Sequence, residues 1–108
     1  MIGGFIVSET PSRVVARALG PELTERGVAN ALSDPTLELH GPNGDILASN
    51  DNWKESAQKD EIIATQVPPT DDRESAIVQT LQPGAYTAVV RGAGNSSGVG
   101  LVEIYALP

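Results

Sequence analysis

The residues best suited to chemistry are three adjacent oxygen-bearing side chains, Asn50-Asp51-Asn52. Calcium binds carboxylate, amide and carbonyl oxygens, so this run together with Asp45 forms one hypothesis for a metal site. The spacing of an EF-hand loop is absent, and no glutamate stands at the twelfth position of such a loop. More distant carboxylates that could add ligands are Asp71, Asp72 and Glu74. Asn and Asp also bind nearby backbone groups in turns, which explains the same residues without a metal.

The same run also predicts the start of a helix. Asn52 is a favourable N-cap, and Glu55 three residues later completes the pattern of a capping box. We therefore expect a short helix over residues 53–65. Trp53 is then expected to lie against the body of the protein and to cover one end of its core.

The chain carries no residue set that specifies a reaction. His40 is the only histidine, and it falls on the polar side of an alternating segment. The serines lack the glycine context of a nucleophile elbow. The adjacent carboxylates Asp60-Glu61 and Asp71-Asp72 are typical of solvated turns, and general acid–base catalysis requires a cleft around such groups. We predict that the protein is not an enzyme.

Composition restricts the classes of partner. The 108 residues fit one domain, and 7 basic against 14 acidic residues give a net charge of −7. This balance argues against nucleic acid, because phosphate binding needs a basic surface. The chain has no cysteine, and no stretch is long enough to span a bilayer. The apolar N-terminal residues lack a basic region and a cleavage site, so we do not expect them to be a signal peptide.

Surface modification and glycan binding have limited support in the sequence. Asn95-Ser96-Ser97 matches a glycosylation acceptor within a glycine-rich loop. Carbohydrate-binding modules use aromatic platforms, and this chain has one Trp, one Phe and two Tyr. Trp53 and Tyr86 are expected in the core, which leaves Tyr105 as an exposed aromatic residue. A glycan remains a hypothetical partner.

Alternating apolar residues predict about seven or eight strands. The alternation is clearest at Leu37 and Leu39 and at Tyr86, Ala88 and Val90. The expected strands cover residues 2–7, 13–19, 36–40, 45–49, 75–81, 85–91 and 99–107. Turn signals such as Gln82-Pro83-Gly84 separate them, and a helical turn is expected after Pro21. The pattern predicts an all-β fold, an antiparallel β-sandwich of jelly-roll or immunoglobulin-like type with one or two short helices.

Several blocks carry a resemblance that covers nearly the whole chain. They are Arg17-Ala18-Leu19-Gly20-Pro21, Ala48-Ser49-Asn50-Asp51-Asn52-Trp53, Glu74-Ser75-Ala76-Ile77-Val78, Pro83-Gly84-Ala85-Tyr86-Thr87 and Gly98-Val99-Gly100-Leu101-Val102-Glu103. These blocks resemble a domain of secreted proteins from environmental bacteria, similar in style to pre-peptidase C-terminal modules. The resemblance implies an extracellular or cell-surface, non-catalytic β-sandwich. Acidic loops bind calcium in some such modules, and Asn50 and Asp51 are the nearest counterparts here.

The N-terminal segment suggests a second kind of function. Ile2-Gly3-Gly4-Phe5-Ile6-Val7 is apolar on both faces, and Thr10-Pro11-Ser12 separates it from the body. We therefore divide the chain into an N-terminal strand, residues 1–11, and a sandwich domain, residues 12–108. The strand either folds into its own sandwich or is exchanged with a neighbouring copy, because short hinges favour swapping.

Two hypotheses about function follow. In the first, the chain is an extracellular structural protein, a pilin-like subunit that forms a homo-oligomeric filament or surface array by strand exchange. In the second, it is a calcium-stabilised accessory module that binds a glycan or a cell surface.

Overall fold

The protein is an all-β sandwich, as the sequence predicts. The computed structural model describes residues 1–107, and Pro108, the last residue of the predicted sandwich domain, lies outside the described residues. The strands are β1 (Ile2–Val7), β2 (Ser12–Leu19), β3 (Pro35–His40), β4 (Ile46–Asn50), β5 (Ser75–Leu81), β6 (Gly84–Gly92) and β7 (Leu101–Ala106). The helical segments are α1 (Pro21–Glu25), η1 (Trp53–Glu55), α2 (Lys59–Ala64) and η2 (Ala93–Asn95). None of the helices in the described residues is long and apolar enough to cross a membrane.

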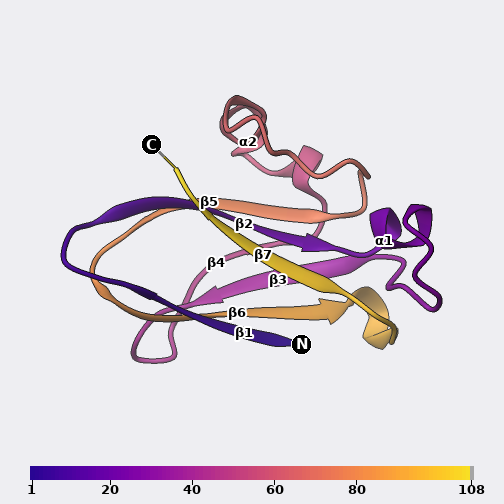
Figure 1. The fold of residues 1–108 in the computed structure, drawn as a ribbon, viewed down its shortest axis with the longest axis horizontal. Coiled ribbons are helices and arrows are strands. Elements are labelled where there is room, and N and C mark those ends of the chain that lie inside the picture. The colour runs from indigo at the N-terminus through magenta and orange to yellow at the C-terminus, as the bar shows by residue number, and fades with distance from the viewer. Residues whose placement is uncertain (108) are drawn as a thin grey trace.

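The strands form two antiparallel sheets that pack face to face (Figure 1). The four-stranded sheet has the order β1-β6-β3-β4, and the three-stranded sheet has the order β5-β2-β7. β1 lies at the edge of the larger sheet and pairs with β6, with Ile2 opposite Val89 and Val7 opposite Gly84. The chain therefore crosses from one sheet to the other between β1 and β2.

The main core lies between the sheets and follows the predicted alternation. Leu37 and Leu39 of β3 are fully buried, and Tyr86, Ala88 and Val90 of β6 face the same interior. The intervening residues of these strands point away from it. Alternation predicts these strands well because one face is buried and the other is solvated.

A second apolar cluster covers the outer face of the three-stranded sheet. Val15 and Val78, which are paired across β2 and β5, pack there against Trp53 and Ile62. β2 is therefore buried on both faces, although its sequence predicts a half-buried strand. The sequence predicts that Trp53 covers one end of the main core. Trp53 instead packs in this second cluster, because η1 and α2 lie over the outer face of the three-stranded sheet.

The predicted helix over residues 53–65 is interrupted. Ser56 has an extended conformation between η1 and α2. Asn52 makes no side-chain bond to the start of η1, so the expected capping box does not form. The interruption places Gln58 beside β5, where its amide donates to the Val78 carbonyl at 2.7 Å and accepts from the Val78 N–H at 3.1 Å. Tertiary contacts thus replace a continuous helix with two short ones.

β7 begins at Leu101 and not at residue 99 as predicted, and one of its predicted inward residues is exposed. Val102 and Ile104 pack against the main core, but Ala106 is exposed rather than inward-facing. β7 is the edge strand of its sheet, and Ala106 borders an open hollow that Phe5 and Val14 also line. An alternating residue is buried only where another layer covers it.

Candidate functional site

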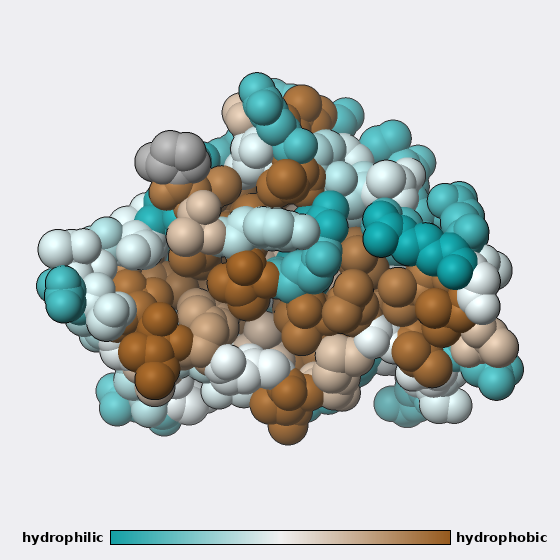
Figure 2. All heavy atoms as spheres, in the orientation of Figure 1, coloured by the Kyte–Doolittle hydropathy of each residue, from teal (hydrophilic) through white to brown (hydrophobic). Residues whose placement is uncertain are grey.

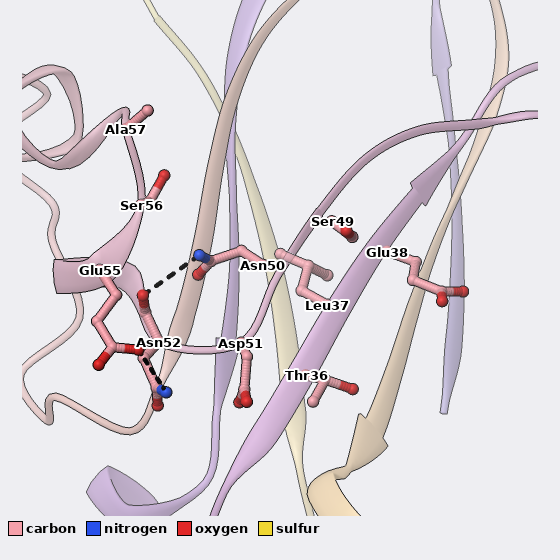
Figure 3. Close-up of a pocket in the computed structure, with 10 residues that line it drawn as sticks. All are labelled: Thr36, Leu37, Glu38, Ser49, Asn50, Asp51, Asn52, Glu55, Ser56 and Ala57. Carbon is pink, nitrogen blue, oxygen red and sulfur yellow. Dashed lines mark hydrogen bonds between the residues drawn. The ribbon is translucent and has the colours of Figure 1, made fainter.

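A polar groove runs beside β4 and contains the run Asn50-Asp51-Asn52 (Figure 3). Its volume is about 740 Å³, and it lies between β4 and the segment that follows η1. The lining residues are Thr36, Leu37, Glu38, Ser49, Asn50, Asp51, Asn52, Glu55, Ser56 and Ala57. Such a volume falls within the range of ligand-binding clefts, about 300–1,000 Å³.

Asn50 uses its side chain to join β4 to the other sheet. Its Oδ1 accepts the Ala76 N–H at 3.0 Å, and its Nδ2 donates to the Asn52 carbonyl at 3.3 Å. The second of these bonds is drawn in Figure 3. The bond to Asn52 corresponds to the turn-forming role that the sequence suggests for Asn50, whereas the bond from Ala76 is a tertiary contact.

Asp51 lies against Asp34, a residue that the sequence analysis does not single out. Burial is the main cause that raises the pKa of the Asp34 carboxyl, and the neighbouring Asp51 carboxyl raises it further. Asp34 Oδ1 is buried without a protein partner among the described residues. The fold thus brings together two carboxyls that are distant in sequence, and a neighbouring like charge disfavours the ionised form of Asp34.

The other predicted metal-site residues do not gather around Asp51. Asp45 precedes β4, whereas Asn50 ends it, so the length of the strand separates them. The Asn52 amide donates to Glu55 Oε2 at 3.2 Å. Within residues 1–107, no group of three or more His, Asp or Glu side chains is arranged to hold a metal ion. The calcium hypothesis stays a prediction, with Asp34 as the residue that the fold adds to it.

The more distant carboxylates named in the sequence analysis have other contacts. Arg73 forms three hydrogen bonds with Asp71, two from its guanidinium and one from its backbone N–H, and holds the pKa of that carboxyl below its usual range. Lys54 pairs with Asp72 at 2.8 Å. Glu74 is fully buried and binds backbone N–H groups. Each of these three carboxylates is therefore bound by groups of the protein itself, and their contacts need no ligand.

Glu38 lines the groove from β3. Its carboxylate accepts from His40 Nε2 at 3.0 Å and from Arg91 Nη1 at 2.8 Å. The bond with His40 is the larger cause, ahead of the bond with Arg91, that lowers the pKa of Glu38. Glu38 therefore stays ionised on the outer face of the sheet.

β1 forms the second candidate site. The inner side chain of Phe5 stacks on Tyr86 with ring centroids 5.7 Å apart, and Val7 is buried. On the outer face, Ile2 is 72% exposed and Ile6 is 77% exposed. Figure 2 shows apolar side chains on the face that carries β1 and β7.

The connection after β1 is a tight and strained turn. The Thr10 N–H donates to the Ser8 carbonyl at 2.8 Å, and Glu9 between them has a φ of 70°. This is a γ-turn with positive φ at its central residue, a rare and strained form. A non-glycine residue held in such a conformation costs about 1–3 kcal/mol. The segment 8–11, which contains the predicted hinge residues Thr10 and Pro11, is thus strained while β1 pairs with β6.

Asn95 lies in the exposed loop between β6 and β7, with a φ of 62°. Its exposure is compatible with modification, and glycosylation at this position stays a prediction. Sequence reasoning did not find Asp34 or the strain at Glu9. Neither has a local signal, because one depends on a tertiary contact and the other on a backbone angle.

The fold defines an antiparallel β-sandwich module, and one solved structure shares it. The chain is similar to the crystal structure of the pre-peptidase C-terminal domain of a collagenase from Bacillus anthracis, with a TM-score of 0.57 and 14% sequence identity. The similarity covers 96% of this chain and 74% of that domain. No family model and no curated protein matches the sequence. At this identity the likeness establishes the fold.

Proposed function

We propose that the protein is an extracellular, non-catalytic structural module that self-assembles by exchanging β1 between copies. The extracellular setting is supported by the sequence resemblance and by the fold shared with a pre-peptidase C-terminal domain. The strained γ-turn at Glu9 is the observation that carries the assembly proposal.

Exchange keeps the contacts of β1 while it releases the hinge. A neighbour's β1 meets the same β6 partners in the same register, including the stack of Phe5 on Tyr86. Because the donated strand makes equal contacts in both states, the strain at Glu9 shifts the balance toward the opened state. If each copy donates to the next without closing, the product is a filament; reciprocal donation gives a closed dimer.

Cysteine cross-linking tests the exchange directly, because the natural chain has no cysteine. Gly4 and Thr87 are paired across β1 and β6 on the outer face. Directly opposed residues in an antiparallel pair have the Cα separation that a disulfide needs. We expect a variant with Gly4→Cys and Thr87→Cys, oxidised after assembly, to give covalent multimers on a non-reducing gel.

The control places the second cysteine outside the β1 interface. A variant with Gly4→Cys and Thr80→Cys has its second thiol at an exposed position of the otherwise mostly buried β5 and reports random collisions. Multimers larger than a dimer in the first variant alone support a filament. Products that end at the dimer contradict the filament, and internally linked monomers alone contradict exchange.

A calcium-stabilised accessory module that binds a glycan or a cell surface is the second candidate function. The juxtaposed carboxyls of Asp34 and Asp51 favour it, because a divalent cation would neutralise their repulsion. Binding to the folded state raises its stability by mass action, about 2.7 kcal/mol at a hundredfold excess over Kd.

Thermal unfolding with calcium chloride and with magnesium chloride at equal ionic strength distinguishes binding from screening. This candidate predicts a rise in melting temperature that calcium produces more strongly than magnesium. Asp51→Asn should remove the rise, whereas Asp60→Asn on exposed α2 should keep it. Equal curves in the two salts would contradict the calcium candidate.

A further inference from the structure

The two sheets differ in how their edges are protected. The edge of β5 is bound by the Gln58 side chain, which makes two hydrogen bonds to Val78. β4 ends the order of its sheet, and within residues 1–107 no strand pairs with its outer edge. β4 therefore presents a free sheet edge, and the polar groove adjoins its last two residues, Ser49 and Asn50 (Figure 3).

The backbone of β4 is suited to bind another strand. Residues of an antiparallel pair alternate in their bonding, so every second residue of β4 directs its N–H and C=O away from β3. Natural sheet edges are commonly blocked by lysine, by proline or by very short strands. The sequence of β4, Ile46–Asn50, contains neither lysine nor proline, so only its length of five residues and a register shift opposite Leu39 and His40 limit pairing at this edge.

The side chains around this edge indicate the charge of a partner. Asp51 and Glu55 contribute carboxylates to the groove, and none of the 10 lining residues is lysine or arginine. Arg91 pairs with Glu38 on the outer face of the sheet, and no ion pair joins Asp51 or Glu55 to a base among the described residues. The groove is thus complementary to lysine and arginine side chains.

The opposite end of the same strand is apolar. Ile46 is 59% exposed and Leu47 is 42% exposed. A bound strand that follows β4 would therefore contact apolar side chains at one end and carboxylates at the other. Main-chain bonds supply affinity in such strand addition, and side chains supply specificity.

We propose that the free edge of β4 binds an extended peptide segment that carries basic residues, as an additional strand of the four-stranded sheet. This site is separate from β1, which occupies the opposite edge of the same sheet. The proposal therefore stands or falls independently of strand exchange.

The probe is a fluorescein-labelled peptide of alternating lysine and valine, six residues long, titrated with the full chain and followed by fluorescence anisotropy. We expect saturable binding that weakens as sodium chloride is raised. A peptide with glutamate in place of lysine should not bind. A peptide N-methylated at alternate residues keeps its charge but loses main-chain donors, and it should bind at least tenfold more weakly.

Charge variants locate the binding. Glu55→Gln removes a carboxylate from the groove and should raise the Kd of the peptide about twofold to fivefold, the range of an exposed ion pair. Asp60→Asn removes one charge from exposed α2, outside the groove, and should leave the Kd within experimental error. Backbone amide NMR shifts on binding should be largest at residues 46–50.

Two results would overturn the proposal. Binding of the N-methylated peptide as tight as that of the parent would show attraction by charge without strand addition. Equal effects of Glu55→Gln and Asp60→Asn would place the peptide elsewhere on the acidic surface.

Discussion

At the scale of single residues, Glu74 is the buried side chain that binds the start of α1. It is fully buried, and its Oε2 accepts the Gly20 N–H at 2.8 Å and the Glu22 N–H at 3.0 Å. Its Oε1 accepts the Asp71 N–H at 3.2 Å. Three backbone donors thus surround one carboxylate, which is a favourable arrangement for an ionised group.

We predict that Glu74→Gln destabilises the protein by about 1–3 kcal/mol, the cost of leaving a buried donor unpaired. An amide has one acceptor oxygen, so its NH₂ group would face a backbone N–H. Urea unfolding at neutral pH measures the change, with Asp60→Asn as a surface control. An unchanged urea midpoint in Glu74→Gln would contradict the assigned role.

Asp34 predicts a pH dependence of stability. Its pKa is raised in the folded state by burial and by Asp51, so the folded protein holds the proton more tightly than the unfolded chain. The stability that Asp34 contributes through this shift is fully present below the pKa of the unfolded chain, about 3.9. It is lost as pH rises through the pKa of the folded state. Glu38 and Asp71 have lowered pKa values, so their contributions are lost as pH falls.

Asp34→Asn isolates this group from the others. We expect the variant to gain stability relative to the natural chain as pH rises from about 4 to 7, because only the natural chain must then ionise a partly buried carboxyl beside Asp51. Urea unfolding at each pH measures the difference between the two proteins. A difference that stays constant over this range would contradict the carboxyl pair.

At the scale of elements, the strained turn between β1 and β2 provides a test of the proposed strand exchange. Glu9→Gly permits the positive φ of 70° without strain and should favour the closed monomer. Glu9→Pro fixes φ near −65°, which excludes the γ-turn, and should favour exchange. Size-exclusion chromatography at several protein concentrations measures the monomer fraction of each variant. Equal monomer fractions would show that the hinge does not control assembly.

At the scale of the whole molecule, a net charge of −7 opposes association of identical subunits. We predict that sodium chloride promotes exchange at neutral pH, because the Debye length falls from about 10 Å at 0.1 M to about 3 Å at 1 M. Light scattering across this range measures the assembled mass. Binding of a basic peptide at β4 should show the opposite dependence on salt, so a common salt response would contradict one of the two proposals.

The strand pattern and most turns were predictable from the sequence. Leu37, Leu39 and the alternating residues of β6 define half-buried strands, because the period of two fixes which face meets the core. The helix over residues 53–65 and the exposure of Ala106 were predicted wrongly. Both depend on what another element covers, and a local pattern contains no information about that cover.

The sequence by itself determined an acidic antiparallel sandwich without cysteine, and it drew attention to Asn50–Asn52 and to the N-terminal strand. Tertiary structure alone placed Asp34 beside Asp51, buried Glu74 under α1 and left the edge of β4 free. The reason is physical. Alternation and turn chemistry act between neighbours in the chain, whereas carboxyl pairing, burial of charge and edge protection depend on segments that only folding brings together.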